Sequence, residues 1–181
     1  MLKQKKAAFE MSITTIVVLV IAMTMLVLGL VLVRSVFKGA TENVLNINEK
    51  VKGEIDKLFT EEGQKTAIYL SQRLAQIKQN EPFGVAFAIK NLGTADKTFS
   101  YATTVVDVGT CGISASNIAG WIITGKDESG ITISPGDAYY TIIRFQPPLN
   151  APLCMARFKV EIKEGTAAYD SFNFDVQIKA K

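Results

Sequence analysis

The sequence contains no histidine, only two cysteines and a single tryptophan among its 181 residues. The absence of histidine removes the commonest general base and the commonest metal ligand. The chain also lacks GxSxG, P-loop, GxGxxG, HExxH and CxxC patterns, which mark widespread catalytic, nucleotide-binding, metal and redox sites. We therefore predict a protein that is not an enzyme and has neither a metal site nor a cofactor.

The excess of positive over negative charge is also small, since the formal net charge is only +3. Through Phe59 there are 8 Lys and Arg against 5 Asp and Glu, whereas the remaining chain carries 12 of each. A balance this even predicts no broad basic surface, and therefore no nucleic-acid partner. No Asn-x-Ser/Thr sequon occurs, so N-glycosylation is not predicted either.

One apolar run dominates the N-terminal part of the chain. Residues 11–33 contain neither a charged residue nor a proline over 23 positions, and a bilayer core requires roughly 20 apolar residues in a helix. A secretory signal would have a shorter core and a small-residue cleavage site after it. We therefore expect a retained transmembrane helix. The lysines before the run favour a cytoplasmic N-terminus and an extracellular C-terminal domain.

Helical periodicity continues beyond the apolar run. Apolar residues recur at a spacing of three or four, which predicts one narrow stripe on an amphipathic helix: Val44, Ile47, Val51, Ile55 and Leu58. If the helix is continuous from about Phe9 to Phe59, it is roughly 75 Å long, with a bend possible near Gly39 or Gly53. The stripe could pack against copies of itself or against the chain's own globular domain, and we favour the second interpretation.

From Lys65 onward the period changes from helical to strand-like. Phe158, Val160 and Ile162 alternate with charged residues, and the same alternation recurs from Phe172 to Ile178. Turn signals separate many such short segments, which is typical of an antiparallel sandwich. We expect Trp121 in the core and a hairpin turn, in preference to a calcium loop, at residues 126–130.

The two cysteines, Cys111 and Cys154, both lie in this C-terminal part. An even pair in an exported domain is typical of one disulfide bond. The alternative is two unpaired thiols buried in a cytosolic domain.

The stretch ITISPGDAYYTIIRFQPPLNAPLCMARFKVEI resembles the late strands of immunoglobulin-like domains found on prokaryotic surfaces. The resemblance implies an Ig-like β-sandwich head over residues 65–181. The expected fold class is thus α+β, with a long N-terminal transmembrane and stalk α-helix over residues 8–60 followed by an all-β Ig-like sandwich.

The opening stretch KKAAFEMSITTIVVL resembles the leader junction of type IV prepilins and archaellins, especially the archaeal kind. This resemblance implies a leader at residues 1–7 in which Lys5 and Lys6 precede the cut. A prepilin-type peptidase would cleave after Ala7 and make Ala8 the new N-terminus. Glu10 could then pair with the new α-amine of a neighbouring subunit. The stem would assemble through its apolar surface, with these further residues at the contacts: Ile13, Ile16, Val17, Val20, Met23 and Val27.

Three functions agree with this layout. The first is a structural subunit of an extracellular type IV pilus-like filament, a homo-oligomer built by burial of the apolar stem. The second is a single-pass membrane protein at the cell surface that displays an Ig-like binding module. The third is an accessory membrane protein of a secretion or pilus machine. We favour the first.

Overall fold

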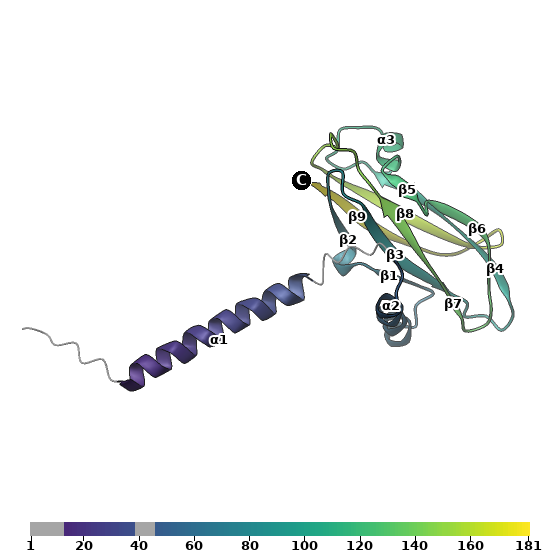
Figure 1. Ribbon diagram of the computed structural model, residues 1–181. Coiled ribbons are helices and arrows are strands. Elements are labelled where there is room, and N and C mark those ends of the chain that lie inside the picture. The colour runs from purple at the N-terminus through teal and green to yellow at the C-terminus, as the bar shows by residue number, and fades with distance from the viewer. Residues whose placement is uncertain (1–12, 39–45) are drawn as a thin grey trace, which may run out of the picture. The chain divides into compact units, whose positions relative to one another are not determined.

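The computed structural model describes residues 13–38 and 46–181. The chain divides into two compact units at Ala40 and Thr41. The first contains the helix α1 (Ile13–Lys38). The second contains a helix α2 (Glu49–Glu62), a β-sandwich and a short helix α3 (Ala115–Ala119). The sandwich is the Ig-like head expected from the sequence (Figure 1).

The predicted long transmembrane and stalk helix is wrong. Residues 46–48 are not helical, and α2 begins afresh because the side chain of Asn48 accepts a hydrogen bond from the backbone N–H of Val51. An asparagine in this position satisfies one of the free donors of a new helix and so favours a start here. Within the described residues, no helix is both long and apolar enough to cross a membrane.

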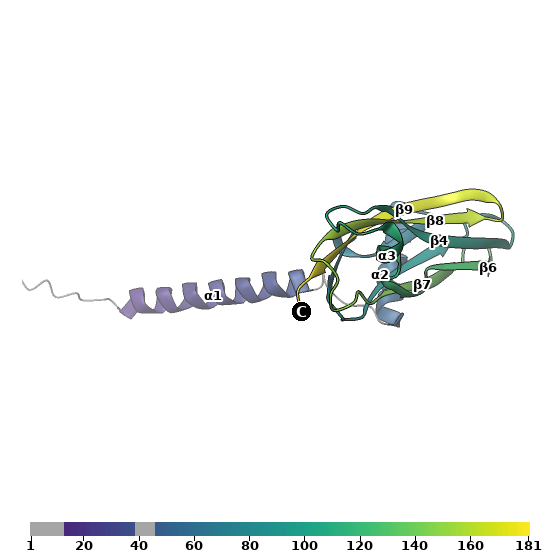
Figure 2. The same ribbon diagram turned by 90° about the horizontal axis from the view of Figure 1, so that it is seen from above.

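Two sheets form the sandwich. The order β1-β3-β7-β5 makes a four-stranded sheet, and β2-β9-β8-β4-β6 makes a five-stranded one. All pairs are antiparallel except β2 with β9. The strand bounds are β1 Thr66–Tyr69, β2 Leu74–Lys78, β3 Phe83–Lys90, β4 Lys97–Asp107, β5 Ile122–Thr124, β6 Asp127–Ile133, β7 Ala138–Phe145, β8 Met155–Glu164 and β9 Ala167–Lys179. Figure 2 shows β9, β8 and β4 side by side in one layer.

The core between the sheets is built by the alternation that the sequence predicts. Phe158, Val160 and Ile162 of β8 are buried, and their neighbours Arg157 and Glu161 are exposed. Phe145 meets the ring of Phe158 edge-on at a centroid distance of 5.2 Å, across the two sheets. Such aromatic pairs add to the stabilisation that burial alone provides. The predicted core position of Trp121 is confirmed, since this side chain is only 3% exposed.

The amphipathic helix α2 covers the outer face of the four-stranded sheet (Figure 1). Its stripe of Val51, Ile55 and Phe59 is buried against small side chains of β1 and β3, namely Ala67, Ala86 and Ala88. Small residues allow the helix to lie close to the sheet. Tyr140 of β7 also donates a hydrogen bond to Asp56 of α2. Of the predicted stripe, Val51 and Ile55 are buried and Leu58 is partly buried in this contact, so the predicted packing against the chain's own globular domain is confirmed for these residues. Val44 lies outside the described residues.

The predicted hairpin turn at residues 126–130 is wrong. Residues 127–130 belong to β6, and the chain turns earlier, at Gly125 and Lys126, where it crosses from one sheet to the other. Gly125 has a φ of 73°, and a Cβ there would collide with the carbonyl oxygen of Ile142. Only glycine therefore permits this crossing. Glu128, expected in the turn, instead accepts hydrogen bonds from Tyr139 of β7 at 2.9 and 3.0 Å.

Two tyrosines of β7 hydrogen-bond to carboxylates and should make stability depend on alkaline pH. Partial burial, followed by the hydrogen bond to Glu128 and its negative charge, raises the pKa of Tyr139 to about 12. Partial burial, followed by the hydrogen bond to Asp56 and its charge, raises the pKa of Tyr140 to about 12 as well.

Between pH 10 and 12 the folded state therefore keeps protons that the unfolded state releases, and the free energy of unfolding is expected to fall as the pH rises through this range. Denaturant unfolding at successive pH values measures the fall. Lysine side chains in general also titrate in this pH range, so the control is a chain with Tyr139→Phe and Tyr140→Phe. Its free energy of unfolding should fall less steeply between pH 10 and 12. An equally steep fall would contradict the assignment to these two tyrosines.

Candidate functional site

The helix α1 presents an apolar surface on every side. Positions 16–21 are consecutive apolar residues, and consecutive residues point about 100° apart around a helix, so these six residues cover its full circumference. Twelve large apolar side chains between Ile16 and Leu30 are exposed, at fractions from 49% to 69%. Thr24 does not interrupt this surface, because its hydroxyl donates to the carbonyl of Ile21 at 2.8 Å.

Five of the predicted assembly residues lie on this apolar surface of α1, namely Ile16, Val17, Val20, Met23 and Val27. They are between 49% and 64% exposed, and their spacing places them on one side of the helix. Their neighbours Val18, Leu19 and Leu26 are equally exposed, however, so the structure does not single out one face. The predicted leader residues Lys5, Lys6, Ala7 and Ala8 lie outside the described residues, as do Glu10 and the side chain of Ile13.

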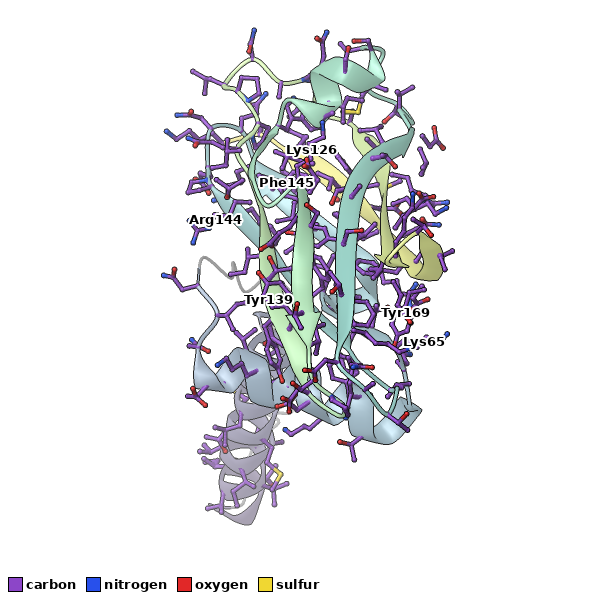
Figure 3. All side chains as sticks on the ribbon, turned by 90° about the vertical axis from the view of Figure 1, so that its right-hand side faces the viewer. Lys65, Lys126, Tyr139, Arg144, Phe145 and Tyr169 are labelled. Atoms are coloured by element: carbon purple, nitrogen blue, oxygen red, sulfur yellow. A yellow bond between two sulfur atoms is a disulfide. The ribbon has the colours of Figure 1, made fainter. Side chains whose placement is uncertain are left out.

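The predicted disulfide between Cys111 and Cys154 is confirmed. Both residues are buried, their Cα atoms lie 4.8 Å apart, and 43 positions separate them in the sequence. Figure 3 shows the bond at the end of the sandwich, close to α3. It joins the connection between β4 and β5, which contains α3, to the connection between β7 and β8. Disulfides of this kind persist in oxidising compartments.

These two connections line an open depression, which we call the loop pocket. Its volume is about 560 Å³, within the range of roughly 300–1,000 Å³ that is typical of small-molecule sites. One wall comes from the α3 connection and consists of Ile113, Ser116, Asn117, Gly120 and Trp121. The other comes from the connection after β7 and consists of Gln146, Pro148, Asn150, Ala151 and Pro152. Sequence reasoning did not find this site, because its walls are more than twenty residues apart and neither contains a recognisable motif.

Several bonds besides the disulfide hold the walls of the loop pocket together. The backbone N–H of Gln146 donates to the carbonyl of Trp121 at 2.7 Å, directly from one wall to the other. The second wall is held to another part of the sandwich, because the side-chain amide of Gln79 donates to the carbonyl of Ala151 at 2.6 Å. Ser114 begins α3 by accepting a hydrogen bond from the backbone N–H of Asn117. The loop pocket is therefore formed before any ligand arrives.

The loop pocket has no titratable side chain among the residues that line it. It therefore offers no general acid or base, and what its lining can do chemically is to form hydrogen bonds and apolar contacts. In the described ranges 13–38 and 46–181, no three acidic or cysteine side chains gather closely enough to hold a metal ion.

The fold thus defines a disulfide-bonded, Ig-like β-sandwich. Neither protein-family models nor curated proteins give a match to the chain. Among solved structures, it is similar to the CARDB domain of a Pyrococcus furiosus protein in complex with di-metal ions. That likeness has 13% identity and a TM-score of 0.41, and covers 59% of this chain and 86% of that one.

A family 123 glycoside hydrolase from Clostridium perfringens is similar at 12% identity and a TM-score of 0.40, over 60% of this chain and 23% of that one. The alpha-2-macroglobulin of E. coli is similar at 10% identity and a TM-score of 0.42, over 58% of this chain and 6% of that one. We assign no function to this chain from these similarities.

Proposed function

We propose that this chain is a structural, non-catalytic subunit of an extracellular pilus-like filament, which assembles through the apolar surface of α1. The observation that carries the proposal is that α1 is apolar on every side and exposed from Ile16 to Leu30. A helix of this kind is stable only when apolar groups surround it. Each Val, Leu or Ile side chain that becomes fully buried contributes about 1.5–3 kcal/mol, so association through α1 is strongly favoured.

A comparison with α2 supports copies of the same helix as the partner of α1. The helix α2 has one apolar stripe, and one face of one sheet is enough to bury it. The helix α1 has no polar face between Ile16 and Leu30, so a single flat surface would leave most of it exposed. Identical helices around it would provide apolar contacts in every direction. A bundle of stems with the sandwich heads outside is therefore the arrangement that we propose.

Export and processing complete the proposal. The disulfide supports a head that folds outside the cytoplasm. We propose that a prepilin-type peptidase cleaves after Ala7, which would remove Lys3, Lys5 and Lys6 from the stem. Glu10 would then pair with the new amino group of a neighbouring subunit inside the apolar bundle.

Cysteine cross-linking tests the contact between stems. Ile16, Val17, Val20, Met23 and Val27 are changed to cysteine one at a time, and filaments isolated from the producing cells are oxidised. We expect covalent dimers at several positions, because packed helices lie about 8–10 Å apart and bring facing Cα atoms within reach of a disulfide. Non-reducing electrophoresis measures the dimers, and intact mass shows whether the subunit starts at Ala8.

The control for this cross-linking is Thr104→Cys on the exposed face of β4. Dimers at stem positions but not at position 104 would support stem assembly. A chain that remains monomeric at all five stem positions would refute it, and the head would then have to act as a singly displayed module. An intact mass that corresponds to a chain starting at Met1 would contradict the proposed cleavage.

A further inference from the structure

The chemistry of the loop pocket differs from that of the rest of the surface. One residue in five of the chain is charged, yet no charged residue lines the pocket. Its polar groups are instead the three amide side chains of Asn117, Gln146 and Asn150 and the hydroxyl of Ser116. None of these amides hydrogen-bonds to another group within the part of the chain that the structure describes. Each one therefore offers free donors and an acceptor to a ligand.

The uncharged lining limits the class of ligand. A charged ligand would lose part of its hydration in this depression without gaining a counter-charge from the lining. A purely apolar ligand would cover the amides and leave their hydrogen bonds unmade, which is also costly. An extended peptide usually joins the edge of a sheet, whereas the loop pocket is made by two loops. A neutral ligand with many donors and acceptors, and with apolar surface between them, fits the pocket best.

We propose that the loop pocket binds a neutral saccharide. Sugar hydroxyls both donate and accept hydrogen bonds, as the amides of Asn117, Gln146 and Asn150 do. The C–H faces of a sugar ring require apolar contacts, and Ile113 and the two prolines of the lining supply them. Leu149 and Leu153, each 61% exposed, are sequence neighbours of Pro148 and Pro152 and extend the apolar surface beyond the pocket.

The position of the loop pocket agrees with a binding role. It lies at the end of the sandwich, where connecting loops meet, and Ig-like domains present their binding loops at such ends. The disulfide and the bond from Gln146 to Trp121 fix the two walls relative to each other. A preformed site avoids the free-energy cost of ordering loops on binding. This proposal goes beyond filament assembly and does not depend on it, because it uses only residues of the head.

Trp121 makes the proposal directly measurable. It lines the loop pocket and is the only tryptophan in the chain. The purified full chain is titrated with maltose, cellobiose, lactose and N-acetylglucosamine, while tryptophan fluorescence and calorimetric heat are recorded. We expect saturable binding of at least one of these neutral sugars. Glucuronate and glucosamine serve as charged counterparts and are expected to bind at least about tenfold more weakly.

Paired amide variants localise the binding. The double variant Asn117→Ala, Asn150→Ala removes two exposed amides and should weaken binding about tenfold or more, with an unchanged thermal unfolding curve. The matched control is Asn173→Ala, which removes an exposed amide of β9 outside the pocket and should bind as the unaltered chain does. The proposal is overturned if calorimetry shows no saturable binding of any of the neutral sugars. It is also overturned if the double variant binds as tightly as the unaltered chain, or if glucuronate or glucosamine binds as tightly as the neutral sugars.

Discussion

Replacement of both Cys111 and Cys154 by alanine is expected to lower the free energy of unfolding by about 4 kcal/mol. The bond closes a loop across 43 positions, and such a cross-link greatly restricts the unfolded chain. In the loop-entropy model this length falls between the values for loops of about 15 and 100 residues, which are roughly 3 and 4.7 kcal/mol. Alanine is preferable to serine because both positions are buried, and a buried hydroxyl without a partner would add a second penalty.

Denaturant unfolding of the two chains under identical conditions measures this difference. Reduction of the unaltered chain provides a control, because it breaks the same bond without changing a side chain, and should give a loss of similar size. A loss below about 1 kcal/mol in both cases would show that the two loops remain in place without the bond. The double alanine variant should also bind saccharide more weakly if the disulfide orders the walls of the loop pocket.

The disulfide could be predicted from the sequence, whereas the loop pocket could not. An even pair of cysteines in a domain expected to be exported is enough to predict the bond. The pocket depends instead on how the α3 connection and the connection after β7 approach each other in the folded sandwich. Asn117 and Asn150 look like ordinary loop residues in the sequence, since loops are rich in asparagine. Only the tertiary arrangement brings their side chains to one pocket.

The strands were predicted well where one side of a strand faces the core and the other faces solvent. The alternation in β8 shows this, because Phe158 and Ile162 are buried and Glu161 is exposed. The prediction failed at residues 126–130, where acidic residues beside a glycine are typical of a turn. There Glu128 is part of β6, where it pairs with Tyr101 of β4, and its carboxylate accepts a hydrogen bond from Tyr139 of the other sheet, a contact that no local pattern reveals.

The helical part was predicted poorly because periodicity alone does not show where one helix stops and another begins. The apolar spacing continues through the chain around Asn48, and the expected single helix followed from that continuity. The N-cap bond of Asn48 shows instead that α2 starts separately. The stripe of α2 then reaches the small residues Ala86 and Ala88 of the sheet. The consequence is that α2 is a structural part of the head, and this can be measured.

Ile55→Ala is expected to lower the free energy of unfolding of the head by about 2–5 kcal/mol. Ile55 has no exposed surface and packs among Val51, Phe59 and the alanines of β1 and β3. Its truncation removes buried apolar contacts and leaves a cavity that the flat alanine surface cannot refill. The matched control is Lys57→Ala on the same helix, whose side chain is 64% exposed and forms an ion pair with Glu54, whose side chain is 43% exposed.

The control should change stability by no more than about 1 kcal/mol, because surface ion pairs contribute little. Denaturant unfolding of both variants, followed by tryptophan fluorescence from Trp121, reports on the sandwich itself. If α2 were a free stalk, Ile55→Ala would change this transition as little as Lys57→Ala does. A large loss for Ile55→Ala alone requires that α2 and the sandwich unfold together. Assembly through α1 would then carry a head whose helix α2 already has its apolar stripe buried against its own sheet, whereas the large apolar side chains of α1 from Ile16 to Leu30 are exposed.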